Sequence, residues 1–233
     1  MLTKNCWLIK IIMKTEIIPT ILVKSFKEVE KRVELVEKYV KRVQLDVMDG
    51  IFVDNETWPY EEKGKPSDLE KIKTKLNFEI HLMIQEPEEV IDEWLKVANR
   101  VIIHFESKIT NREYGIRNLI EKVHGQKKEI GLALNPETHY AVATPFLKDL
   151  DLVQVMTVQP GWGGQEFREW VLAKIEFLRK FWPKGNIEVD GGINDENIKR
   201  VFRAGANLFG VGTHIYKSKN IEKAIKGLEK LIK

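Results

Sequence analysis

Two aspartates of this chain stand in contexts that suit acid–base chemistry. Asp46 ends an apolar run and continues into Val-Met-Asp-Gly, and Asp190 ends another run directly before Gly191 and Gly192. Two carboxylates that face one cavity can remove a proton from one face of a substrate and deliver a proton to the other. Either aspartate alone could cap a loop amide, but the pair favours a catalytic role.

A histidine extends this pair into a candidate metal site. His81 stands at the end of a third apolar run, between Ile80 and Leu82. Taken alone, such a residue is more often a satisfied core histidine. Together with Asp46 and Asp190 it forms a donor set that suits a borderline divalent cation such as Zn, Mn, Co or Fe(II). Such an ion polarises a substrate carbonyl.

Three glycine-rich turns follow the last apolar runs of the chain. They are Pro-Gly-Trp-Gly-Gly-Gln at 160–165, the pair at 191–192, and Gly-Val-Gly-Thr at 210–213. Glycines let backbone N–H groups approach an anion closely, although they also make tight turns. The candidate phosphate-binding residues are Gly161, Trp162, Gly163, Gly164, Gly191, Gly192, Gly212 and Thr213.

The elements that must position these residues follow a regular alternation. Short apolar runs recur at 16–22, 42–47, 77–83, 100–104, 129–134, 151–157, 186–190 and 206–212. Helical patterns separate them, such as the one opened by the capping box of Ser25 and Glu28. Strands that are apolar up to polar C-terminal ends predict a (βα)8 TIM barrel with its site at the C-terminal rim.

Composition restricts the class of protein further. The 233 residues carry a net charge of +3 with interspersed signs, so no nucleic-acid partner is indicated. The single cysteine, Cys6, is consistent with a reducing compartment, and we expect a cytoplasmic protein. Residues 1–14 are predicted to be an N-terminal extension, too short for a membrane span, and residues 15–233 the barrel domain. The sequence leaves open whether the protein forms a homo-oligomer.

Several motifs of this chain resemble those of the ribulose-phosphate 3-epimerase family. They are Asp-Val-Met-Asp-Gly at 46–50, His-Leu-Met-Ile at 81–84, Gly-Leu-Ala-Leu-Asn-Pro-x-Thr at 131–138, Met-Thr-Val-x-Pro-Gly-x-Gly-Gly-Gln-x-Phe at 156–167, and Val-Asp-Gly-Gly-Ile at 189–193. The resemblance spans about residues 17 to 216, in the right order. It implies a barrel of the ribulose-phosphate-binding type.

The resemblance also implies a mechanism and its residues. Members interconvert D-ribulose 5-phosphate and D-xylulose 5-phosphate by two-base proton transfer at C3, through an enediolate that a metal stabilises. Asp46 and Asp190 would be the acid–base pair and, with His81, ligands of one divalent metal ion. His81 would also lie against the substrate, and Thr20 stands where the family usually has a serine that contacts it. Met48, Met83 and Met156 would form an apolar pocket floor, or simply fill the core.

One departure from the family pattern concerns the metal. The family's fourth ligand is a histidine two residues before Asp46, and here that residue is Gln44. Three outcomes stay open. The metal is held by Asp46, His81 and Asp190, with Gln44 or water completing the shell; or its preference shifts from zinc toward manganese or magnesium; or the site is lost.

Two other functions follow from the departures. The stretch 51–55 differs from the family's usual sequence, which leaves open a 3-epimerase of a ketohexose 6-phosphate such as allulose 6-phosphate. Gln44 leaves open a non-catalytic phosphosugar-binding protein. In every case the expected partner is a phosphorylated ketose, with no membrane. A decarboxylase is disfavoured because the strand motif at 46–48 contains no lysine.

Overall fold

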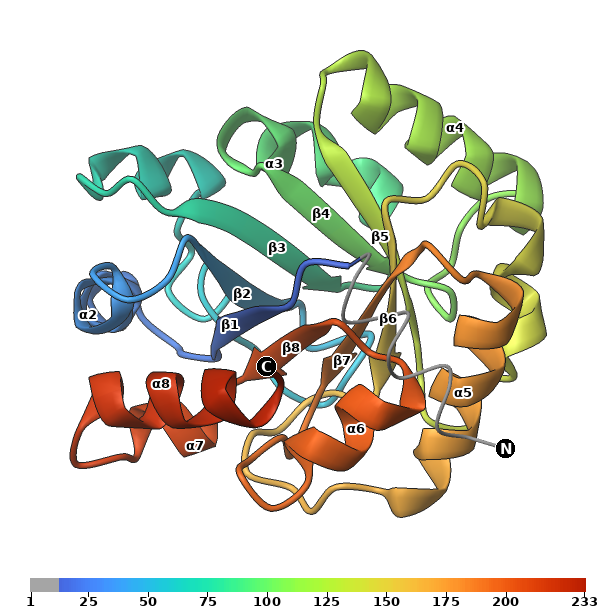
Figure 1. The fold of residues 1–233 in the computed structure, drawn as a ribbon. Coiled ribbons are helices and arrows are strands. Elements are labelled where there is room, and N and C mark those ends of the chain that lie inside the picture. The colour runs from blue at the N-terminus through green and yellow to red at the C-terminus, as the bar shows by residue number, and fades with distance from the viewer. Residues whose placement is uncertain (1–12) are drawn as a thin grey trace.

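The computed structural model describes residues 13–233, which form a closed barrel of eight parallel strands in sequential order (Figure 1). The strands are β1 (Glu16–Ile21), β2 (Arg42–Met48), β3 (Asn77–Met83), β4 (Arg100–His104), β5 (Glu129–Leu134), β6 (Leu152–Met156), β7 (Asn186–Asp190) and β8 (Leu208–Val211). The predicted (βα)8 fold is confirmed. Four of the eight predicted runs share both ends with a strand, and the others differ by one or two residues at an end.

Helices surround the barrel on its outside (Figure 1). The α-helices are α2 (Phe26–Val36), α3 (Ile91–Val97), α4 (Arg112–Gly125), α5 (Leu172–Phe181), α6 (Ile198–Ala204), α7 (Thr213–Tyr216) and α8 (Ile221–Leu231). Shorter 3-10 helices are η1 (Pro66–Lys71), η2 (Pro87–Glu89), η3 (Tyr140–Phe146) and η4 (Glu169–Val171). The predicted cap of α2 is present, because the Ser25 hydroxyl accepts from the Glu28 N–H at 3.3 Å.

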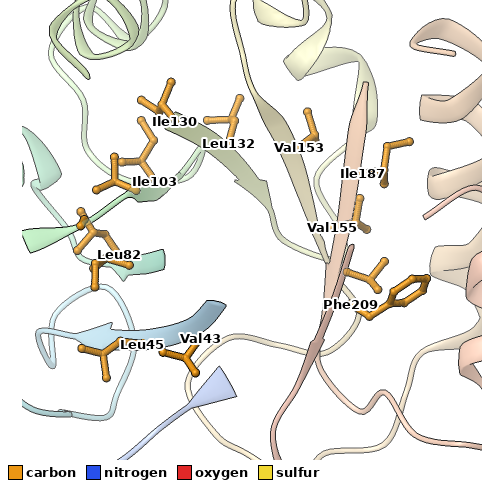
Figure 2. Packing of buried hydrophobic residues seen from close by; sticks show 14 of the residues in the cluster. Val43, Leu45, Leu82, Ile103, Ile130, Leu132, Val153, Val155, Ile187 and Phe209 are labelled. Atoms are coloured by element: carbon orange, nitrogen blue, oxygen red, sulfur yellow. The ribbon is translucent and has the colours of Figure 1, made fainter. Parts of the chain in front are cut away.

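The main core lies between the strands and the helices. Side chains of a strand alternate between its two faces, so Val43 and Leu45 of β2 point outward while Gln44 and Asp46 point into the barrel. Figure 2 shows the outward layer, with Val43, Leu45, Leu82, Ile103, Ile130, Leu132, Val153, Val155, Ile187 and Phe209. Fully burying one such side chain stabilises the fold by about 1.5–3 kcal/mol.

The barrel interior is more polar than the sequence pattern suggests. Charged and amide side chains are buried on the inward faces below the rim: Arg100 at the start of β4, and Gln44, Glu79, Gln154 and Glu188 at the third residue of their strands. A small apolar cluster of Ile102, Ala133 and Leu152 accompanies them. The expectation of strands that stay apolar up to the rim was therefore wrong for their inward faces. Every second residue of a strand faces the barrel interior and not the apolar core between the strands and the helices.

The N-terminus and the loop after β2 lie outside this regular pattern. Residues 1–12 of the predicted extension lie outside the described residues. In the loop after β2, Trp58 is fully buried and packs against Phe26 and Trp94, with ring centroids 5.4 and 6.1 Å away. This anchors the loop to the helical layer. Across residues 13–233, every helix is too short or too polar to cross a bilayer.

Candidate active site at the barrel rim

Strand pairing brings the three predicted acid–base and metal residues together. In the register of β2 and β3, Asp46 lies opposite His81, and Asp190 reaches the same space from β7. All three side chains are buried, and one donor atom of each lies within 4.8 Å of the other two. Residues separated by up to 144 positions thus form one cluster at the C-terminal end of the barrel.

The donor atoms of this cluster have the spacing of cation ligands. The distance from His81 Nδ1 is 3.1 Å to Asp46 Oδ1 and 3.5 Å to Asp190 Oδ2. Tetrahedral zinc with bonds of about 2.0–2.1 Å separates neighbouring ligand atoms by about 3.3 Å. Asp46, His81 and Asp190 therefore fit a divalent cation as three of its ligands.

Burial and mutual charge shift the pKa values of this cluster. Burial and the neighbouring charge of Asp190 raise the pKa of Asp46 to about 6. Burial opposes protonation of His81, but hydrogen bonds to Asp190 and Asp46 outweigh it and raise the pKa of the imidazole to about 9. Without a cation, His81 is an imidazolium at neutral pH, and it must release its Nδ1 proton to bind one.

A second histidine lies directly behind His81. His104 Nε2 is 2.8 Å from His81 Nε2, and His104 Nδ1 is 3.3 Å from Glu106 Oε2. Burial lowers the pKa of His104, so we assign a neutral ring whose Nδ1–H donates to Glu106 and whose Nε2 accepts from His81. This chain of hydrogen bonds points His81 Nδ1 at the two aspartates. The sequence pattern placed His104 at a strand end but gave it no role.

We expect His104→Phe to weaken metal binding by about 10- to 100-fold, because the ring stays but can no longer orient His81. The measurement is the dissociation constant of Co(II) in competition with a chelating dye, with the melting temperature as a check of folding. The control is His124→Phe, which replaces an exposed histidine paired with Asp151. Equal cobalt affinity of the two variants would contradict the role of His104.

Gln44 points its amide nitrogen, and not its carbonyl oxygen, at this cluster. Gln44 Nε2 donates to Asp46 Oδ1 at 2.7 Å and to Asp190 Oδ2 at 2.8 Å. An amide N–H2 group has no lone pair to give a cation. In this orientation Gln44 does not fit the position of a fourth metal ligand.

A cavity of about 400 Å³ opens above the cluster. Asp46 and Asp190 line it together with all of the predicted phosphate-binding residues and with every predicted substrate-side residue except His81: Thr20, Met48, Met83, Met156, Gly161, Trp162, Gly163, Gly164, Gly191, Gly192, Gly212 and Thr213. His81 and Gln44 lie beneath its wall, since both side chains are fully buried. The cavity thus contains a carboxylate end and a glycine-rich end.

At Gly192, the glycine end of the cavity requires the absence of a side chain. Gly192 has a φ of +67°, and a Cβ there would lie 2.9 Å from the Gln165 carbonyl oxygen and 2.9 Å from the Phe167 nitrogen. The turn after β7 therefore packs tightly against the loop after β6. This close contact shapes the rim where loops of such barrels usually bind phosphate.

Basic side chains at this end were not predicted. Arg32 and Lys217 line the same cavity, and the Arg32 guanidinium lies 4.4 Å from the ring centroid of Tyr216. Arg32 comes from α2, which is far from the glycine turns in sequence. Only the closure of the barrel, which pairs β1 with β8, brings these segments together.

The fold and this rim place the protein among the (βα)8 barrels, whose sites lie at the C-terminal ends of the strands. Within them, the chain belongs to the ribulose-phosphate 3-epimerase family. The family model described as "Ribulose-phosphate 3 epimerase family" matches residues 16–216. Ribulose-phosphate 3-epimerase of Schizosaccharomyces pombe is 37% identical over 218 residues, which cover 92% of each chain. The Bacillus subtilis protein of that name is 35% identical over 219 residues, covering 90% of this chain and 96% of the relative.

Solved structures at low identity show the same fold. KGPDC from Streptococcus mutans aligns with a TM-score of 0.68 at 16% identity, over 94% of this chain and 98% of the other. A 3-hexulose-6-phosphate synthase aligns with a TM-score of 0.66 at 18% identity, over 95% and 100%. These similarities support the barrel architecture.

Proposed function

We propose that this protein is a ribulose-phosphate 3-epimerase that interconverts D-ribulose 5-phosphate and D-xylulose 5-phosphate. The observation that carries the proposal is that Asp46 of β2 and Asp190 of β7 line one cavity together with the glycine-rich turns of the rim, in a chain of this family. The relatives named ribulose-phosphate 3-epimerase support the same activity. The substrate partner would be a phosphorylated ketose.

The two aspartates divide the proton transfer between them. One carboxylate removes the proton from C3 of the ketose, which leaves an enediolate, and the other carboxylic acid delivers a proton to the opposite face of C3. In the cluster without a cation, burial and the charge of Asp190 raise the pKa of Asp46 to about 6, which places its proton exchange close to neutral pH, as a general acid–base group requires. After one turnover the two groups have exchanged protonation states, ready for the reverse reaction.

The surrounding residues orient the sugar and hold a charge. Bound to Asp46, His81 and Asp190, a divalent cation (Zn, Mn, Co, Fe(II) or Mg) would supply positive charge that favours the enediolate. The thioethers of Met48 and Met83 make an apolar floor that offers no competing proton donor. Met156 completes that floor.

The remaining proposed contacts fix the two ends of the ketose. Thr20, whose side chain lines the cavity, would donate to a substrate hydroxyl. Backbone amides of the glycine-rich rim would bind the phosphate, and Arg32 and Lys217 would add positive charge at that end. We further propose a cytoplasmic enzyme without a nucleic-acid or membrane partner, in keeping with its interspersed charge.

The test is epimerisation of D-ribulose 5-phosphate by chelator-stripped protein, then with Zn, Mn, Co, Fe(II) or Mg added singly. We expect turnover that a metal restores. Allulose 6-phosphate is assayed under the same conditions and is expected to react with a lower kcat/KM. Absence of pentulose 5-phosphate turnover with every ion would overturn the proposal, and faster hexulose turnover would reassign the substrate.

A further inference from the structure

A second buried glutamine, Gln154, hydrogen-bonds to the Gln44 amide inside the barrel. Gln154, on β6, donates from Nε2 to Gln44 Oε1 at 2.7 Å across the barrel interior. The same Nε2 donates to Glu188 Oε1 at 3.1 Å. Gln44, Gln154 and Glu188 all have fully buried side chains, so water does not compete for these bonds.

The Gln44 amide nitrogen faces the same three atoms that a cation would contact. It lies 2.7 Å from Asp46 Oδ1, 2.8 Å from Asp190 Oδ2 and 3.4 Å from His81 Nδ1. Its two hydrogens satisfy the carboxylate oxygens in place of a metal charge. A cation that enters the cluster must either share this space with an N–H2 group or turn the amide around.

Turning the Gln44 amide around costs free energy, because it breaks the hydrogen bond from Gln154. If Gln44 presented Oε1 to the cluster, its N–H2 group would face the N–H2 group of Gln154, and the 2.7 Å hydrogen bond would be lost. If Gln154 turned as well, its own Oε1 would face Glu188 Oε1. A buried polar group that loses its partner costs about 1–3 kcal/mol. Both amides are therefore held in their present orientation.

We propose that Gln154 is a positioning residue that keeps Gln44 a hydrogen-bond donor to Asp46 and Asp190, so that only three side chains of this site ligate a divalent cation. Gln154 thereby lowers the metal affinity of the site. The inference deepens the proposed function, because it concerns the same acid–base cluster. It is tested by metal binding without substrate, so its failure is distinguishable from a failure of the epimerase proposal.

The experiment titrates metal-free protein with Co(II) and compares the wild type with Gln154→Leu. Leucine cannot donate to Gln44 Oε1, so the Gln44 amide becomes free to turn its oxygen to the metal. We expect the dissociation constant to fall by at least about 10-fold, the scale of outer-shell effects on metal sites. The visible absorption of cobalt should change too, since a side-chain oxygen joins the shell.

A double-mutant cycle separates this role from a general effect of substitution. In a Gln44→Leu background, Gln154→Leu should leave the cobalt affinity unchanged within about threefold, because no amide remains to turn. An equal gain in both backgrounds, or no gain in either, would overturn the proposal. The control Gln126→Leu replaces an exposed glutamine at the end of α4 and should have no effect.

Two further measurements cover a failure of the leucine variant to fold. Gln154→Met keeps an unbranched side chain of similar length, and we expect it to lower the dissociation constant of Co(II) as Gln154→Leu does. In the wild-type protein, the Gln44 side-chain amide protons should give NMR signals far from those of exposed glutamines, and should keep them at saturating Zn(II). Replacement of these signals at saturating Zn(II) by those of an N–H2 group that no longer contacts Asp46 and Asp190 would show that the amide turns despite Gln154, and would overturn the proposal.

Discussion

Replacing Asp190 with asparagine is expected to lower kcat for pentulose 5-phosphate epimerisation by about 10²- to 10⁴-fold, the usual contribution of one general acid–base group. Asparagine has nearly the same shape, but its amide cannot take up the C3 proton. Asp46→Asn should have a loss of similar size. The double variant should lose little more than either single variant, because the two groups act in one cycle.

Isotope exchange distinguishes loss of one base from general damage. In deuterated water, the variant that keeps only Asp46 should exchange the C3 proton of one epimer with solvent, and the variant that keeps only Asp190 should exchange that of the other. Both exchanges are measured by NMR at saturating metal, with metal content determined for each variant. Asp149→Asn, at an exposed position, is the control with full activity. Exchange of both epimers by both variants would contradict the two-base assignment.

The outward face of the barrel explains why the strands could be predicted so closely. Val153 and Val155 alternate with Gln154, and Ile187 and Val189 alternate with Glu188, yet every run is bounded by turn residues. A strand buried on both faces is recognised in the sequence as a short run bounded by turn residues, even where its inward residues are polar. The positions of Asp46 near the end of β2 and of Asp190 at the end of β7 then followed directly.

The partners of these aspartates could not be predicted in the same way. Gln44 and Gln154 are 110 residues apart, and Gln44 and Asp190 are 146 apart. Which inward residues meet depends on the closure and register of the barrel, which no local pattern encodes. The amide orientation of Gln44 depends in turn on a hydrogen bond from Gln154, so the sequence left it open whether Gln44 was a ligand.

The same limit applies to the charged groups at the bottom of the barrel. Arg100 donates to Glu79 Oε2 at 2.5 Å, and its Nη1 lies 3.7 Å from Glu188 Oε2. Burial and the nearby charge of Glu79 raise the pKa of Glu188 well above its ordinary value. A proton shared by Glu79 and Glu188 would serve the buried oxygens Glu79 Oε1 and Glu188 Oε2, which have no hydrogen-bond partner within residues 13–233. Arg100 then balances the remaining negative charge.

Arg100→Met is consequently expected to destabilise the protein by about 3–5 kcal/mol, the cost of leaving a buried charge without its partner. Methionine approximates the length of the arginine stem but cannot donate to Glu79 or Glu129, which accepts from Arg100 Nε at 2.7 Å. For a chain of this size, the change corresponds to a fall in Tm on the order of 10 °C. Reversible urea unfolding at neutral pH measures the free energy directly.

Two further variants test whether the destabilisation by Arg100→Met comes from the buried charges. Arg200→Met removes an ion pair to Glu169 in which both side chains are about half exposed, and should cost no more than about 1 kcal/mol. Adding Glu79→Leu and Glu188→Leu to Arg100→Met should restore most of the stability, because no uncompensated carboxyl group then remains inside the barrel. If Arg100→Met cost no more than Arg200→Met, the interior carboxyl groups would have to be neutral without the guanidinium. Each of these carboxyl groups would then carry its own proton, and Gln154 would face an uncharged Glu188.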